Sequence, residues 1–153
     1  MSRSAFVGLV EEHFPELVSW IWRCYGAKQF LLLKGQEPLL SAAGVQQGDP
    51  LGPFLFCLAV HPVLRKLARS VVPLAYMDDI YLVSSNVERL KEAVLALKDD
   101  LEKLNLKVNF NKCRTTRQVP GLEEIAVDKE LKVLGVPLSV DADRGPLDKE
   151  TGY

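Results

Sequence analysis

The sequence has almost no net charge and no long uninterrupted apolar run. Its 153 residues include 19 Lys and Arg against 20 Asp and Glu, which gives a formal net charge of −1. This balance argues against a chain that is coated with nucleic acid over its whole surface. The longest apolar stretch, residues 51–63, is interrupted by prolines and a histidine and is too short to span a bilayer. We therefore expect no membrane partner.

Cysteine is scarce, and its spacing excludes two classes of protein. Cys24, Cys57 and Cys113 lie far apart, so no pair has the spacing of zinc ligands, and an odd number argues against a disulfide framework. Cys57 falls in an apolar run and is expected in the core. The N-terminus lacks the basic and apolar segments of a secretory signal. These features favour an intracellular location, with nucleus and cytoplasm both open.

Two adjacent carboxylates stand between two apolar segments. Residues 71–75 precede them and residues 80–83 come after, and both segments are rich in branched and aromatic residues that favour β-strands. The pattern predicts a hairpin with Met77, Asp78 and Asp79 at or near its tip. Two carboxylates held this close repel each other, and Mg²⁺ compensates such a pair well because it prefers oxygen ligands. The alternative is an Asp-Asp pair on a solvated surface turn.

A glycine-bearing loop at residues 44–53 leads into an apolar helix. Asp49-Pro50 has the composition of a helix cap and first turn, and the helix is expected to end near Ser70. One interpretation is a polar loop that enters a buried helix. The other is a nucleotide-facing loop in which glycine lets the backbone approach a ligand and Gln47 offers an amide to a base or sugar.

The remaining periodicity predicts an alternation of helices and short strands. Ser85 has capping-box spacing with Glu88, and an amphipathic helix of about five turns begins there. Apolar spacing places Trp20 and Tyr25 in the core, although either ring could also stack on bases. Helices are expected over residues 4–12, 15–26 and 87–104, and strands over 29–34, 39–42, 106–110, 124–127 and 131–137. Residues 139–153 are polar and aperiodic and are expected to form a mobile tail.

The motifs, taken together, resemble those of reverse transcriptases, and most closely those of non-LTR (LINE-like) retrotransposons. The resemblance is carried by residues 44–53 together with residues 75–79. Residues 106–113 look like the next motif of that family, and residues 131–137 look like its primer-grip region. The likeness covers about residues 1–138, which we expect to form one partial palm domain.

The resemblance implies a fold, a reaction and partners. The fold is α+β, a partial polymerase palm in which an antiparallel sheet with an Asp-Asp hairpin packs on two main helices. The reaction is that of an RNA-directed DNA polymerase, template-directed nucleotidyl transfer to a primer 3′ end with two Mg²⁺ (or Mn²⁺) ions. The partners are an RNA template, a DNA primer and a deoxynucleoside triphosphate.

The resemblance also implies roles for individual residues. The metal ligands are Asp78 and Asp79, and Lys112 matches the lysine that protonates the leaving pyrophosphate. The primer end and the nucleotide or template pocket involve Gln47, Gly48, Tyr76 and Met77. The remaining contacts are the primer grip at Leu134 and Gly135 and the nucleic-acid backbone at Lys107 and Arg114. For the basic residues, a solvated face remains the alternative.

One family feature has no counterpart in the sequence. The family's palm carries a further aspartate that bridges both metals, on a strand before the first helix, and residues 2–6 resemble the segment just after that strand. We therefore expect the isolated chain to be inactive, with missing polymerase segments supplied by a longer chain. The alternatives are a non-catalytic remnant that binds nucleic acid and, least favoured, a helical interaction module built on residues 87–104.

Overall fold

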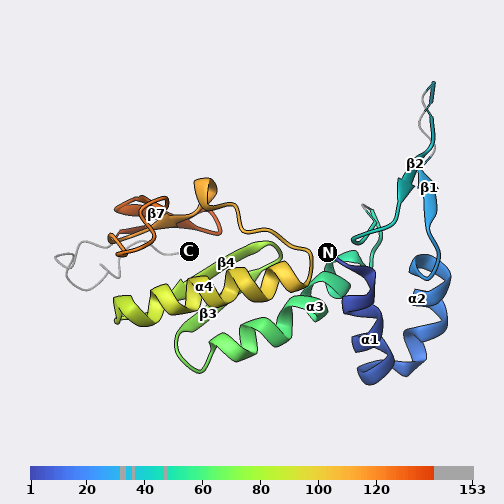
Figure 1. Cartoon of the computed structure of the whole chain (residues 1–153), viewed down its shortest axis with the longest axis horizontal. Coiled ribbons are helices and arrows are strands. Elements are labelled where there is room, and N and C mark those ends of the chain that lie inside the picture. The colour runs from blue at the N-terminus through green and yellow to red at the C-terminus, as the bar shows by residue number, and fades with distance from the viewer. Residues whose placement is uncertain (32–33, 36, 47, 140–153) are drawn as a thin grey trace, which may run out of the picture. The chain divides into compact units, whose positions relative to one another are not determined.

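The computed structural model describes residues 1–31, 34–35, 37–46 and 48–139, and it combines helices with short paired strands (Figure 1). The chain divides into two compact units, Met1–Val108 and Asn109–Tyr153. The mixed α and β class is as expected. The single domain over residues 1–138 stays a prediction. The tail expected at 139–153 lies outside the described residues apart from Ser139.

The first unit begins with two helices that share a core. α1 (Arg3–His13) is followed by a 3₁₀ helix (Pro15–Leu17) and by α2 (Val18–Tyr25). A cluster of buried side chains joins them to the third helix; its members are Phe6, Val10, Ile21, Tyr25, Leu55 and Ala59.

Some expected details of these two helices are confirmed and others are wrong. Gly26 ends α2 as expected, and Tyr25 is buried. Ser2 rather than Ser4 is the residue that precedes the first turn of α1. The prediction that Trp20 belongs to the core is wrong, because its side chain is 54% exposed. Apolar spacing marks one face of a helix, and Trp20 lies beside that face.

α3 (Gly52–Leu67) and α4 (Val87–Lys103) form the second core of this unit. Asn86 caps α4 by accepting a hydrogen bond from the Arg89 backbone, so the expected cap at Ser85 is off by one residue. The helix ends at Lys103, and Asn105, the expected stop, follows the cap residue Leu104 with a φ of 55°. The buried residues that join the two helices are Val60, Val63, Leu67, Val71, Ala93, Leu97 and Leu101.

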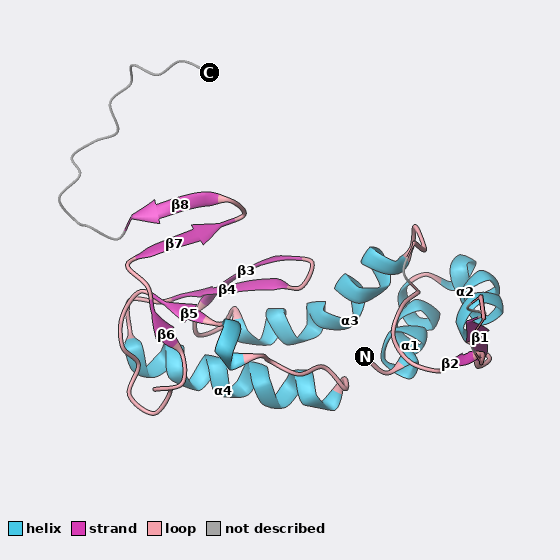
Figure 2. Ribbon diagram, turned by 90° about the horizontal axis from the view of Figure 1, so that it is seen from above, coloured by secondary structure: helices cyan, strands magenta, loops and turns pink. Residues whose placement is uncertain are grey.

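The first unit carries two antiparallel hairpins. β1 (Gln29–Leu31) pairs with β2 (Leu39–Ser41), and β3 (Val72–Tyr76) pairs with β4 (Asp79–Val83). The β3–β4 hairpin lies along α3 and α4 (Figure 2) and contributes Ile80 and Leu82 to their core. This packing fixes where the β3–β4 loop projects.

The strand expected over residues 106–110 does not form. Leu106 and Val108 pack against the α3–α4 core while Lys107 and Asn109 are exposed, so burial alternates as in a strand. No neighbouring strand in the described part of the chain pairs with this segment, and a 3₁₀ helix (Phe110–Lys112) comes next. The alternation of apolar and polar residues therefore predicted correctly which side chains are buried, but it wrongly predicted that the segment pairs with another strand.

The second unit contains two further pairs of strands. β5 (Arg114–Thr115) pairs in parallel with β6 (Ala126–Val127), and β7 (Glu130–Val133) pairs antiparallel with β8 (Val136–Ser139). The single strand expected over 131–137 is wrong, because Leu134 and Gly135 both have positive φ and form a two-residue turn. Positive φ at both positions is the requirement of a type I′ hairpin turn.

The structure also bears on Cys57 and on membrane-spanning helices. The prediction that Cys57 is buried is wrong, because its side chain is exposed on α3. Among the described residues, none of the helices combines the length and the apolar character that crossing a membrane requires.

Candidate functional site

The two adjacent aspartates lie at the loop end of the β3–β4 hairpin. Tyr76 pairs with Asp79, so Met77 and Asp78 are the two residues of the connection. Met77 has a φ of 54°, a conformation that is uncommon for residues other than glycine. Asp78 and Asp79 are both exposed, and neither forms an ion pair or a side-chain hydrogen bond with another described residue. Both carboxylates are therefore available to a ligand.

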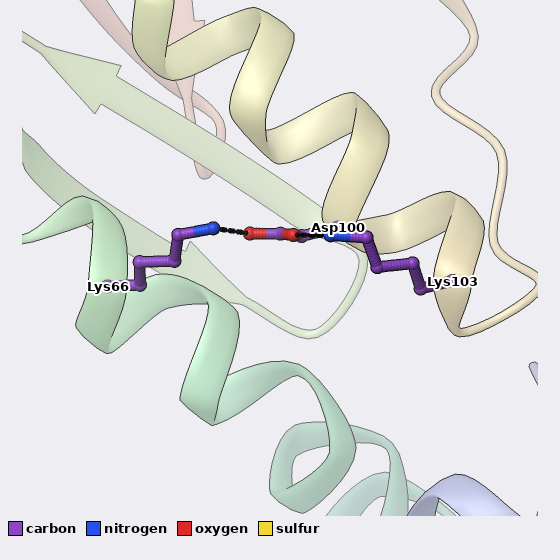
Figure 3. A network of polar contacts seen from close by, with 3 residues as sticks. All are labelled: Lys66, Asp100 and Lys103. Carbon is purple, nitrogen blue, oxygen red and sulfur yellow. Dashed lines mark hydrogen bonds and ion pairs between the residues drawn. The ribbon is translucent and has the colours of Figure 1, made fainter.

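The chain has a second pair of adjacent aspartates, Asp99 and Asp100, whose surroundings differ from those of Asp78 and Asp79. Asp100 on α4 accepts a hydrogen bond from Lys66 on α3 and another from Lys103, both at 2.6 Å (Figure 3). Hydrogen bonding to Lys103 and then to Lys66 lowers the pKa of Asp100. The charge of the Asp100 carboxylate is thus already balanced by two lysines, and its bond to Lys66 joins α4 to α3. The pair at Asp78 and Asp79 has no such partners among the described residues.

The outer face of the same hairpin is apolar and exposed. Val72, Leu74 and Tyr76 alternate along β3 and are 58%, 52% and 61% exposed, and Val83, which pairs with Val72, is 54% exposed. Side chains two apart on a strand share a face, whereas those one apart point to opposite faces. One face of this hairpin therefore covers the core, and the other leads along β3 to the aspartates.

The glycine-bearing loop has a defined backbone on both sides of the residue that the structure does not describe. Gly44 and Gly48 have φ values of 72° and 86°, which suit glycine. Asp49 accepts a hydrogen bond from the Leu51 backbone at 2.9 Å. The helix begins at Gly52 with Pro53 in its first turn, so the start expected at Asp49-Pro50 is too early. Gln47 lies outside the described residues.

Tyr25 connects α2 to this loop. Its hydroxyl donates a hydrogen bond to Asp49 and accepts one from the Gln46 backbone at 3.2 Å. Burial, together with the hydrogen bond to Asp49, raises the pKa of Tyr25 to about 12. The hydroxyl therefore stays protonated near neutral pH and can act as a donor and an acceptor at once.

Arg3 holds the beginning of the loop from α1. Its guanidinium lies over the Tyr25 ring, 5.4 Å from the centroid, and donates to Gly44 O, Ala27 O and Ser41 Oγ at 3.3, 3.1 and 3.0 Å. Only 9% of the residue is exposed. Sequence reasoning missed this residue, although its spacing from Phe6 and Val10 on α1 indicates a cation on a buried helix face.

The other residues with expected roles divide between the two units. Lys107 is exposed in the first unit. Lys112 and Arg114 are exposed in the second unit, where the Arg114 guanidinium donates to two backbone carbonyls of its own segment. Leu134 and Gly135 form the β7–β8 turn there. Within the first unit, the hairpin loop brings together Asp78, Asp79, Tyr76 and Met77.

The donor set at the hairpin loop fits a partly hydrated magnesium ion. Mg²⁺ keeps several waters and is usually held by one or two carboxylates together with substrate phosphates. Asp78 and Asp79 supply two exposed carboxylates. Over the described ranges, no group of three or more His, Cys, Asp or Glu side chains gathers to hold a metal. A metal ion at this loop would therefore need waters or substrate phosphates beside the two aspartates.

Comparison with known proteins gives one family and several relatives. The family model described as reverse transcriptase (RNA-dependent DNA polymerase) matches residues 7–138. The retrovirus-related Pol polyprotein from the type-1 retrotransposable element R2 of Nasonia vitripennis is 28% identical over 125 residues, 76% of this chain and 12% of its own length.

Two further relatives are also R2 polyproteins. The corresponding type-1 polyprotein of Bradysia coprophila is 34% identical over 101 residues, 60% of this chain and 11% of its own. The type-2 R2DM polyprotein of Drosophila melanogaster is 33% identical over 88 residues, 52% of this chain and 8% of its own. The chain thus spans about a tenth of the length of these relatives. No solved structure matches it significantly.

Proposed function

Because the chain belongs to the reverse transcriptase (RNA-dependent DNA polymerase) family, we propose that it forms part of a polymerase palm that extends a primer on an RNA template. The R2 relatives agree with the predicted non-LTR type of that family. The proposed substrates are a deoxynucleoside triphosphate and a DNA primer 3′ end. The proposed palm covers residues 1–138, and the proposed location is intracellular.

The proposed roles derive from the hairpin loop and the glycine-bearing loop. Asp78 and Asp79 would hold divalent metal, which when bound activates the attacking oxygen and stabilises the leaving one. Tyr76 and Met77 would flank the primer end, while Gln47 and Gly48 would line the nucleotide pocket. Lys112, Leu134 and Gly135 keep their expected roles as leaving-group acid and primer grip.

One observation carries this proposal, namely the two exposed carboxylates at the end of a hairpin that packs on the α3–α4 core. Ile80 and Leu82 anchor β4 in the α3–α4 core, so the adjacent Asp79 projects from a fixed strand. Aspartate side chains on an exposed loop, with no cationic partner, can bind a hard divalent ion. The desolvation cost is low because the ion keeps several of its waters. We propose that two carboxylates do not suffice for catalysis, so that the 153-residue chain alone does not extend a primer.

Paramagnetic Mn²⁺ tests the metal site without any need for activity. In NMR spectra of the 153-residue chain, we expect Mn²⁺ to broaden the backbone amide signals of Met77, Asp78 and Asp79 first. Asp78→Asn should abolish this broadening at the same Mn²⁺ concentration. Asp99→Asn is the matched control, because it changes an exposed aspartate of the other Asp-Asp pair.

Broadening that is equal around both Asp-Asp pairs would contradict the proposal, since it would reflect nonspecific attraction to carboxylates. Primer extension with Mg²⁺, run in parallel, addresses the reaction. We expect no extension by the chain alone, and extension that disappears in Asp78→Asn would show that two carboxylates are enough.

A second candidate function is nucleic-acid binding without catalysis. It is favoured by the exposed cations at Lys107 and Arg114, neither of which forms an ion pair with another described residue. Contacts from such cations to phosphate make binding fall as salt rises. Binding of a primer–template that weakens with salt and with Lys107→Ala, but is unchanged in Asp78→Asn, would favour this candidate.

A further inference from the structure

The glycine-bearing loop is held by side chains from two other helices. Arg3 on α1 donates to the carbonyl of Gly44, at the beginning of the loop. Tyr25 on α2 binds the Gln46 amide and the Asp49 carboxylate, which lie on either side of residues 47 and 48. The loop therefore has fixed points before and after the two residues with expected roles in nucleotide binding.

We propose that Tyr25 is a positioning residue for the nucleotide pocket, with Arg3 behind its ring as the support that fixes it. This inference rests on the proposed function, because holding the loop matters only if residues 47 and 48 contact the nucleotide. No covalent step is assigned to Tyr25. Its role is to hold the backbone on both sides of the pocket residues in one shape.

The hydroxyl of Tyr25 is suited to this task because it makes two hydrogen bonds of opposite sense. It donates to the Asp49 carboxylate and accepts from the Gln46 N–H. A phenylalanine at position 25 would keep the ring, its edge contact with Phe6 and its place under the Arg3 guanidinium, yet it would lose both hydrogen bonds. The substitution thus separates loop positioning from core packing.

Asp49 extends the same network into α3. One carboxylate oxygen accepts from Tyr25 and the other accepts from the Leu51 N–H, just before the helix begins. The backbone amide of Gly52 also donates to the Asp49 carbonyl at 3.0 Å. The loop is therefore continuous with a helix whose buried residues, including Leu55, belong to the same core as Tyr25.

Amide hydrogen exchange of the full 153-residue chain tests this role residue by residue. In Tyr25→Phe, we expect exchange of the Gln46 amide to rise roughly five- to tenfold, because its acceptor is lost. Exchange of the Ile21 amide in α2 should be unchanged. Trp22→Phe is the matched control, since it removes another side-chain hydrogen bond of α2, the one that Trp22 donates to Glu11. This control should leave Gln46 exchange as it is.

A second readout separates positioning from general stability. Binding of Mg²⁺ and dTTP, measured by equilibrium titration, should weaken at least about twofold in Tyr25→Phe, because a less populated loop shape reduces apparent affinity. Mn²⁺ broadening at Asp78 should be unchanged. Asp49→Asn keeps one acceptor oxygen where the carboxylate has two, so it should restore only part of the loop protection that Asp49→Ala loses.

Two results would overturn the assignment of Tyr25. One is Gln46 exchange in Tyr25→Phe that equals that of the wild type. The other is exchange that rises equally at Gln46 and Ile21, which indicates loss of the core rather than of the loop. A wild-type chain that binds neither Mn²⁺ at Asp78 nor dTTP contradicts the proposed function instead, and in that case Gln46 exchange still decides whether Tyr25 holds the loop.

Discussion

Replacing Arg3 by methionine should destabilise the first unit by about 2–4 kcal/mol. The substitution keeps the apolar stem and removes the guanidinium, which leaves three acceptors without their donor. All three hydrogen bonds are only partly buried, so each contributes a net of about 0.5–1.5 kcal/mol. The sum is reduced because the wild type also spends free energy on burying a cation that has no carboxylate partner among the described residues.

Urea denaturation monitored by circular dichroism measures this loss as a lower midpoint at constant slope. Arg23→Met is the matched control, because Arg23 is exposed on α2, and it should change stability by less than about 0.5 kcal/mol. Arg3→Lys should recover only part of the loss, since an ammonium cannot reproduce the planar fork of donors. A loss below about 1 kcal/mol in Arg3→Met, or full recovery by lysine, would refute the view that this fork holds the loop.

Three further predictions concern other parts of the chain. Hydrogen bonds from Lys103 and Lys66 lower the pKa of Asp100, so its contribution to stability is present above the ordinary value of 3.8 and is lost as pH falls through the lower folded value. The urea midpoints of wild type and Asp100→Asn should therefore differ at pH 7 and converge only as the pH falls below 3.8. Leu134→Asn should slow amide exchange in β7 and β8 by roughly threefold, because asparagine tolerates the left-handed conformation better than leucine, and unchanged exchange would contradict the assigned turn. Gly26→Ala should lower the urea midpoint by the equivalent of about 1–3 kcal/mol, because the new Cβ would lie 2.5 Å from the carbonyl oxygen of Trp22, and a more stable variant would show that the helix end relaxes freely.

Local signals in the sequence were enough to predict α1 to α4 and where α2 and α4 end, whereas the beginnings of the helices were less well placed. Gly26 and Asn105 lie just beyond their helices as expected. Asn105 takes the left-handed conformation that ends a helix, whereas Gly26 stays in the right-handed region with a φ of −69°. The β3–β4 pairing was predictable from two apolar segments around a short polar turn. These features depend on neighbours within a few positions, so a single sequence contains them.

Features that depend on distant partners could not be predicted in the same way. The alternation of apolar and polar residues predicted the burial of Leu106 and Val108. Whether the segment forms a strand depends on a partner strand beside it, and the segment's own sequence does not show whether that partner is present. The network around Tyr25 joins residues up to about forty positions apart, from Arg3 to Gly44 and from Tyr25 to Asp49. Composition marks such residues as core or loop, and only the folded contacts reveal that they act together.

The apolar outer face of the β3–β4 hairpin has a consequence for the behaviour of the chain in concentrated solution. Apolar side chains are exposed to water on this face, namely Val72, Leu74 and Val83. Covering them lowers the free energy of the system. A chain whose formal charge is −1 has little long-range repulsion to keep two such surfaces apart. These side chains, with the other exposed apolar residues of the described chain, therefore lower its osmotic second virial coefficient. We expect solutions of the chain to scatter more light per molecule as they are concentrated.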